Sequence, residues 1–136
     1  MTESYHLHLV SDSTGETINS VARACLVQFE GVEVTEHAWN LVRTKRQVQK
    51  VVTGIERNPG VVLFTLVDMK LRGALENACR ELQVPCVAIM DPVISALSGY
   101  LGLKSRAKPG LQHALDAEYF ARIDACLLYT SPSPRD

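Results

Sequence analysis

The sequence has almost no net charge and no long apolar run, and these two absences exclude several classes of protein. A formal net charge of −1 over 136 residues gives no basic field that would favour nucleic acid. No stretch is apolar enough and long enough to cross a bilayer, and residues 1–4 do not begin a secretory signal. We therefore expect a cytoplasmic protein that binds neither nucleic acid nor a membrane.

The sequence also lacks the spacings that are typical of metal sites. Its four cysteines form no C-x-x-C pair and no zinc-type pattern. They are Cys25, Cys79, Cys86 and Cys126. We expect reduced thiols, mostly buried, and no metal centre. His6 and His8 lie on one face of an expected strand without a third ligand nearby, so we expect solvated histidines on a strand near the edge of a sheet.

The apolar pattern that is present predicts a single α/β domain. Strands are expected over residues 5–10, 32–39, 61–67 and 84–90, the last two buried on both faces. Helical periodicity separates them over residues 18–29, 48–55 and 70–83, and it returns at 93–101 and 111–125. Alternating strands and helices indicate βαβ units. We predict a layered, mainly parallel, Rossmann-like sheet of about four strands with flanking helices.

A polar loop, Ser-Asp-Ser-Thr-Gly-Glu-Thr at residues 11–17, joins the first strand to the first helix. We expect Ser13 and Glu16 to form a capping box for that helix, and Gly31 to end it. A helix N-terminus binds anions through its backbone N–H groups and partial positive charge. The residues of this loop that we expect to contact phosphate, or to face a target protein, are Ser13, Thr14, Gly15, Glu16 and Thr17.

Three aspartates follow the expected strands. Asp12, Asp68 and Asp91 fall at carboxyl ends, which is where ligands bind in open α/β sheets. They could hold magnesium or act as acid and base, or each could simply cap the next helix. Asp12 is the one for which capping is the weakest explanation, and it is our candidate catalytic residue.

A basic group precedes and enters the second helix. It consists of Arg43, Lys45, Arg46 and Lys50. These side chains could bind phosphate or dock an acidic partner, and a solvated helix face explains them without any function.

Two stretches together resemble one known family. Residues 11–17 resemble the N-terminal signature of the regulatory proteins of phosphoenolpyruvate synthase and of pyruvate, phosphate dikinase. A second pattern is similar to the segment that closes the family's N-terminal half: His113, Leu115, Asp116, Tyr119, Phe120, Arg122, Ile123 and Ala125. The resemblance covers residues 5–125, and the synthase branch looks the closer one.

The resemblance implies a bifunctional serine/threonine kinase and phosphotransferase. Such an enzyme phosphorylates a threonine of its target, phosphoenolpyruvate synthase or pyruvate, phosphate dikinase, with ADP as the donor. It removes that phosphate with inorganic phosphate as the acceptor and releases pyrophosphate. ADP or ATP and phosphate are therefore the implied substrates of the full-length family. The sequence leaves the oligomeric state open, with a homodimer as one alternative.

The family's glycine-rich nucleotide loop is missing from this sequence. No G-x-x-x-x-G-K-[ST] motif occurs in the 136 residues. We expect residues 1–125 to be the N-terminal α/β domain, truncated before a second, P-loop kinase-like half. Residues 126–136, which include two prolines among serines, resemble a non-native or disordered tail. We expect the fragment alone to be inactive and to hold no bound cofactor.

Two functions without catalysis remain open. The chain could be a receiver-like binding domain with Asp12, Asp68 and Asp91 in one acidic pocket. It lacks the adjacent acidic residues and the late lysine that a receiver needs. It could also be a scaffold that docks a dikinase through the basic helix at residues 43–50. A receiver would bind magnesium alone, whereas a scaffold would bind only its target.

Overall fold

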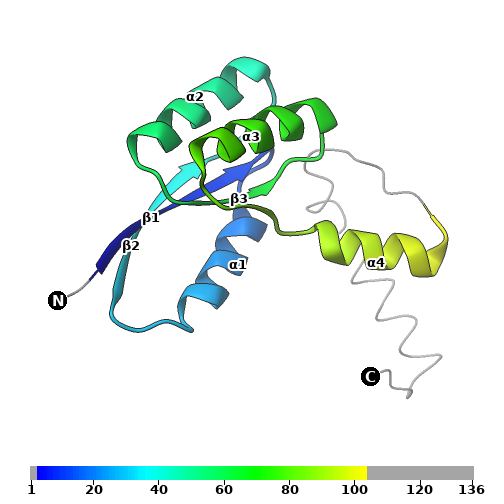
Figure 1. Cartoon of the computed structure of the whole chain (residues 1–136). Coiled ribbons are helices and arrows are strands. Elements are labelled where there is room, and N and C mark those ends of the chain that lie inside the picture. The colour runs from blue at the N-terminus through cyan, green and yellow to red at the C-terminus, as the bar shows by residue number, and fades with distance from the viewer. Residues whose placement is uncertain (1–2, 104–136) are drawn as a thin grey trace.

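The computed structural model describes residues 3–103, in which strands and helices alternate strictly (Figure 1). The elements are β1 (Glu3–Ser11), α1 (Glu16–Leu26), β2 (Val32–Trp39), α2 (Lys45–Arg57), β3 (Val61–Thr65), α3 (Met69–Leu82), β4 (Cys86–Ala88) and α4 (Asp91–Leu101). The expected helix at 111–125, the second family motif and the tail lie outside the described residues. Each of the other expected elements is present.

All four strands are parallel and lie in the order β2-β1-β3-β4, which confirms the predicted sheet. From β1 the chain moves outward to β2, then crosses β1 and continues through β3 to β4. The direction of winding therefore reverses between β1 and β3. In the register of these two strands Ser11 lies opposite Thr65, so their carboxyl ends meet at the crevice where this class of fold binds ligands.

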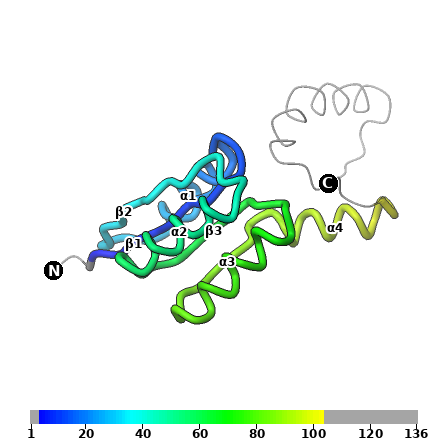
Figure 2. Tube along the Cα trace, turned by 90° about the horizontal axis from the view of Figure 1, so that it is seen from above, coloured from blue at the N-terminus to red at the C-terminus, as the bar shows by residue number. Residues whose placement is uncertain are grey.

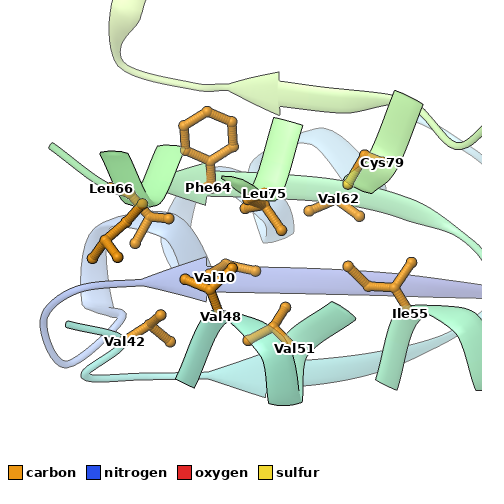
Figure 3. Packing of buried hydrophobic residues seen from close by; sticks show 11 residues of the cluster. Val10, Val42, Val48, Val51, Ile55, Val62, Phe64, Leu66, Leu75 and Cys79 are labelled. Carbon is orange, nitrogen blue, oxygen red and sulfur yellow. The ribbon is translucent and has the colours of Figure 1, made fainter. Parts of the chain in front are cut away.

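Helices cover both faces of the sheet, with α2 and α3 on one side and α1 on the other (Figure 1). The larger core joins Val10, Val62 and Phe64 of the sheet to apolar residues of α2 and α3 (Figure 3). Those helix residues are Val48, Val51, Ile55, Leu71, Leu75 and Cys79. A smaller cluster packs Ile18 and Ala22 of α1 against Leu7 and Leu9. The sheet is thus fixed from both sides behind the carboxyl-end loops.

The expectation of a solvated edge strand at the N-terminus is wrong. β1 lies between β2 and β3, and His8 is fully buried beneath α2. The Nε2 atom of His8 lies 2.8 Å from the carbonyl oxygen of Asn58, and its Nδ1 atom lies 3.1 Å from the indole nitrogen of Trp39. The alternation of histidines with apolar residues along β1 predicts a face exposed to solvent. The histidine can be buried there because these hydrogen bonds satisfy both of its ring nitrogens.

Several predicted helix ends also differ from the structure. The N-cap of α1 is Gly15, and Ser13 donates its backbone N–H to Ser11 Oγ, so the predicted capping box does not form. Gly31 is left-handed (φ 76°), but it lies beyond the end of α1 and leads into β2. Asp68 does cap α3, accepting from the backbone N–H groups of Lys70 and Leu71.

The last described strand and helix are less covered than expected. β4 has three residues and lies at the edge of the sheet that the described residues form, and Val87 on it is exposed. The expected apolar stripe of α4 is exposed as well: Val93, Leu97, Tyr100 and Leu101. Figures 1 and 2 both show α4 extending away from the sheet. Among residues 3–103, therefore, no layer covers this helix.

Candidate functional site

Three loops meet at the carboxyl ends of β1, β2 and β3. The loop after β2 lies against the loop after β1 through two backbone hydrogen bonds. The Leu41 N–H donates to the Ser13 carbonyl and the Val42 N–H to the Ser11 carbonyl, each at 2.9 Å. This pairing holds residues 11–15 in a defined path beside the crevice between β1 and β3.

Asp12 connects the loop after β1 to the loop after β3. Its side chain is buried, with the residue only 2% exposed. Oδ2 accepts a hydrogen bond from the Val67 N–H at 3.0 Å, whereas buried Oδ1 has no hydrogen-bond partner among the residues that the structure describes. Burial raises the pKa of Asp12, although the Val67 N–H and the charge of Arg43 act in the opposite direction. Asp12 is therefore not a helix cap. It is a buried carboxylate at the switch point, the place between β1 and β3 where the direction of winding reverses.

Arg43 brings one member of the basic group to this loop. Its Nε donates to the backbone carbonyl of Asp12 at 2.7 Å. The capping box of α2 fixes the approach, because the Gln47 side chain accepts from the backbone N–H groups of Arg43 and Thr44. Lys45, Arg46 and Lys50 lie on α2 and are exposed. A charged guanidinium thus lies beside Asp12, while the rest of the basic group forms a solvated face.

The loop residues differ in how far they reach solvent. Ser13 and Gly15 are buried, Thr17 is half-buried, and Thr14 and Glu16 are exposed. Gly15 has φ 88°, and a Cβ atom at this position would lie 2.4 Å from Asn40 Oδ1. The left-handed backbone therefore favours glycine here, and any larger residue would also have to displace the Asn40 side chain. The N-terminus of α1, with its partial positive charge, begins at the same place.

The three aspartates do not form one acidic pocket. Asp68 caps α3, and the Asp91 carboxylate pairs with Arg72, so neither is available to join Asp12. Met90 is the N-cap of α4, which makes the predicted cap role of Asp91 wrong as well. Within residues 3–103 no three histidine, cysteine or acidic side chains are arranged to hold a metal ion.

Sequence reasoning missed two polar residues near this edge of the sheet. Thr65 interrupts the apolar run of β3 and is buried, and Arg72 follows one turn into α3 with most of its side chain buried. The signal was present in both cases: a hydroxyl inside an apolar strand, and an arginine on the sheet-facing side of a helix. Arg43 was recognised as basic, but its contact with Asp12 depends on the loop after β2.

A model of the kinase/pyrophosphorylase family matches residues 7–130. The chain belongs to the kinase/pyrophosphorylase family. Over 123 residues it is 61% identical to a protein of Paramagnetospirillum magneticum named as a pyruvate, phosphate dikinase regulatory protein, covering 90% of this chain and 40% of that one. A Rhodospirillum rubrum protein of the same name is 54% identical, with 90% and 45% covered. The chain thus spans less than half the length of these relatives.

The names of these kinase/pyrophosphorylase relatives concern the dikinase branch. A Caulobacter vibrioides relative, 51% identical over 89% of this chain and 38% of its own, carries the same name. The expectation that the synthase branch is closer receives no support from them. In the described part of this family member, no helix is long and apolar enough to cross a membrane.

Proposed function

We propose that this chain is the N-terminal part of a bifunctional regulator of pyruvate, phosphate dikinase or phosphoenolpyruvate synthase. The regulator phosphorylates a threonine of its target with ADP as the donor, and it removes that phosphate with inorganic phosphate as the acceptor, releasing pyrophosphate. Family membership supports the kinase and pyrophosphorylase chemistry. The observation that carries the assignment to this half is the buried Asp12 carboxylate beside Arg43 at the switch point.

Phosphoryl transfer depends mainly on positioning and on stabilising charge. In the proposed mechanism Asp12 Oδ1 accepts the proton of the threonine hydroxyl as its oxygen bonds to the β-phosphorus of ADP, and AMP leaves. A raised pKa suits a carboxylate that must take up a proton. Arg43 and the loop at residues 13–17 would neutralise the phosphoryl oxygens. The nucleotide loop would come from the remainder of the full-length protein.

The test is Asp12→Asn in a full-length family member whose first 125 residues are this sequence. We expect both transfer directions to fall at least about 100-fold, because the variant keeps the side-chain volume but loses the base. Mass measurement of the target threonine peptide, with ADP in one arm and phosphate in the other, gives both rates. Asp68→Asn is the matched control, since it removes an aspartate that only caps α3. Unchanged rates in Asp12→Asn would remove this residue from the mechanism.

The 136-residue chain by itself should not phosphorylate the dikinase, because it has no glycine-rich nucleotide loop. Incubation with ADP and the target, followed by the same mass measurement, checks this. Phosphorylation by this chain alone would contradict the proposal that the remainder of the full-length protein supplies the nucleotide loop.

A second candidate function is docking without catalysis. The exposed row of Lys45, Arg46 and Lys50 on α2 favours it, because an acidic partner surface could bind there. Under this alternative the isolated chain binds the target enzyme with an affinity that falls as salt is raised, and Asp12→Asn leaves binding and full-length activity unchanged.

A further inference from the structure

A cavity of about 120 Å³ lies at the carboxyl ends of β3 and β4, between the first turns of α3 and α4. Its walls are partly apolar and include Phe64, Met90 and Ile94, and its polar lining comes from Thr65, Arg72 and Asp91. An apolar cavity of about 150 Å³ accommodates benzene, so this one has room for a single small group. The mechanism proposed above makes no use of it.

Two hydrogen-bond donors at this cavity are buried without partners among the described residues. The Thr65 residue is 7% exposed, and its Oγ1 makes no hydrogen bond there. The Arg72 side chain is 16% exposed, lies over the Phe64 ring at 5.2 Å, and has a buried Nε with no partner in the same range. A buried donor without an acceptor is costly, so the lining favours a group that brings acceptor oxygens.

The N-terminus of α4 borders the same cavity. Met90 is its N-cap and provides no side-chain hydrogen bond, and Pro92 in the first turn has no N–H. The contrast is α3, where the Asp68 carboxylate accepts from two backbone N–H groups. The first turn of α4 therefore borders the cavity with its positive end, which the Asp91 carboxylate in the same turn offsets for as long as it stays there.

Asp91 occupies the outer edge of the Arg72 guanidinium. Arg72 Nη1 donates to Asp91 Oδ1 at 3.1 Å, and Nη2 pairs with Oδ2. The Asp91 side chain is 46% exposed, so its carboxylate is hydrated again when it turns away from Arg72. Arg72 has no such freedom, because leaving it buried and unpaired would be strongly unfavourable. Glu76, at 4.0 Å from Arg72 and also exposed, is a weaker second partner.

We propose that this cavity is a binding site for a small oxyanion, a phosphate or carboxylate group, and that the ligand displaces Asp91 from Arg72. Carboxylate and phosphate both fit the two-pronged geometry of arginine, so one can replace the other. Thr65 and Arg72 both line the cavity, and Thr65 Oγ1 and Arg72 Nε are the further donors that we assign to the anion. Asp91 acts as an internal competitor that lowers the apparent affinity, so the site fills only at a high concentration of the anion.

The experiment is a titration of the 136-residue chain with inorganic phosphate, in which NMR monitors the chemical shifts of the Val93 and Ile94 amides. Chloride keeps the ionic strength constant. We expect saturable shifts in the wild type. Asp91→Asn removes the competing charge at equal volume, and it should tighten binding about tenfold, which equals about 1.4 kcal/mol. Thr65→Val should weaken binding several-fold, and Arg72→Gln should abolish it. A parallel titration with acetate shows whether a planar carboxylate serves as well as a tetrahedral phosphate.

Arg80→Gln is the matched control, because Arg80 is an exposed arginine in the last turn of the same helix. It should leave the affinity unchanged. The proposal is overturned if Asp91→Asn binds phosphate no more tightly than the wild type. It is also overturned if Arg80→Gln loses as much affinity as Arg72→Gln, which would indicate an adventitious ion only. Because the key result is a gain of affinity, misfolding of a variant cannot produce it.

Discussion

His8 shows how a single polar residue can be fixed inside this core. The Trp39 indole N–H donates to Nδ1, so Nδ1 must be unprotonated, and Nε2–H then donates to the Asn58 carbonyl. The ring also stacks on His37 at a centroid distance of 4.6 Å. Burial lowers the pKa of His8 and outweighs the hydrogen bond to the Asn58 carbonyl, which acts in the opposite direction; His37 and His6 lower it further. The fold therefore favours the neutral form of this side chain.

This arrangement predicts acid-sensitive stability. A histidine that stays neutral in the fold binds a proton in the unfolded chain below about pH 6.5, so the free energy of unfolding should fall as the pH drops below that value. Urea denaturation at pH 7.5 and at pH 5.5, at one ionic strength, measures the difference. In His8→Gln the difference should shrink, whatever the variant costs at pH 7.5. If the free energy of unfolding differs between the two pH values by the same amount in both proteins, His8 is not the source of the acid sensitivity.

At the scale of elements, most strands and helices were predictable because their patterns are long. The apolar run of β3 and the periodicity of α2 and α3 identify these elements and most of their buried residues. Helix ends were less predictable, because a cap is one hydrogen bond among several that compete for it. Ser13 illustrates this, since its backbone bonds to Ser11 Oγ while Gly15 begins α1. Asp91 likewise pairs with Arg72, a residue that is distant in sequence.

The start of α1 gives a prediction with an internal control. Gly15→Ala places a Cβ atom in the left-handed region and against Asn40, so it should destabilise the protein by about 2 kcal/mol. Gly73→Ala lies inside α3 with nothing within 4 Å of the new Cβ, so it should stabilise the protein by about 0.5–1 kcal/mol. Denaturant unfolding of both variants checks the signs. Equal effects of the two substitutions on stability would mean that the left-handed backbone at Gly15 does not restrict this position to glycine.

At the scale of the whole molecule, the sequence indicated a parallel α/β sheet but not its strand order. Asp12 and the loop at residues 11–17 were recognisable as a candidate site because they follow a strand and precede a helix. That β1 is central, and that Asp12 therefore contacts Val67 after β3, depends on the order β2-β1-β3-β4. The contact of Arg43 with the Asp12 carbonyl depends on the same order. Pairing between distant segments sets these features, and local patterns do not encode it.

The measurement that tests this account most directly compares Arg43→Ala with Arg46→Ala in the full-length enzyme. Arg43 contacts the loop after β1, whereas Arg46 is an exposed neighbour of the same charge on α2. If the switch point binds the reacting phosphate, Arg43→Ala should lower kcat/KM for phosphate-dependent dephosphorylation at least about tenfold, and Arg46→Ala should leave it unchanged. If both variants retain wild-type rates, or both lose activity equally, the crevice between β1 and β3 is not the reacting site.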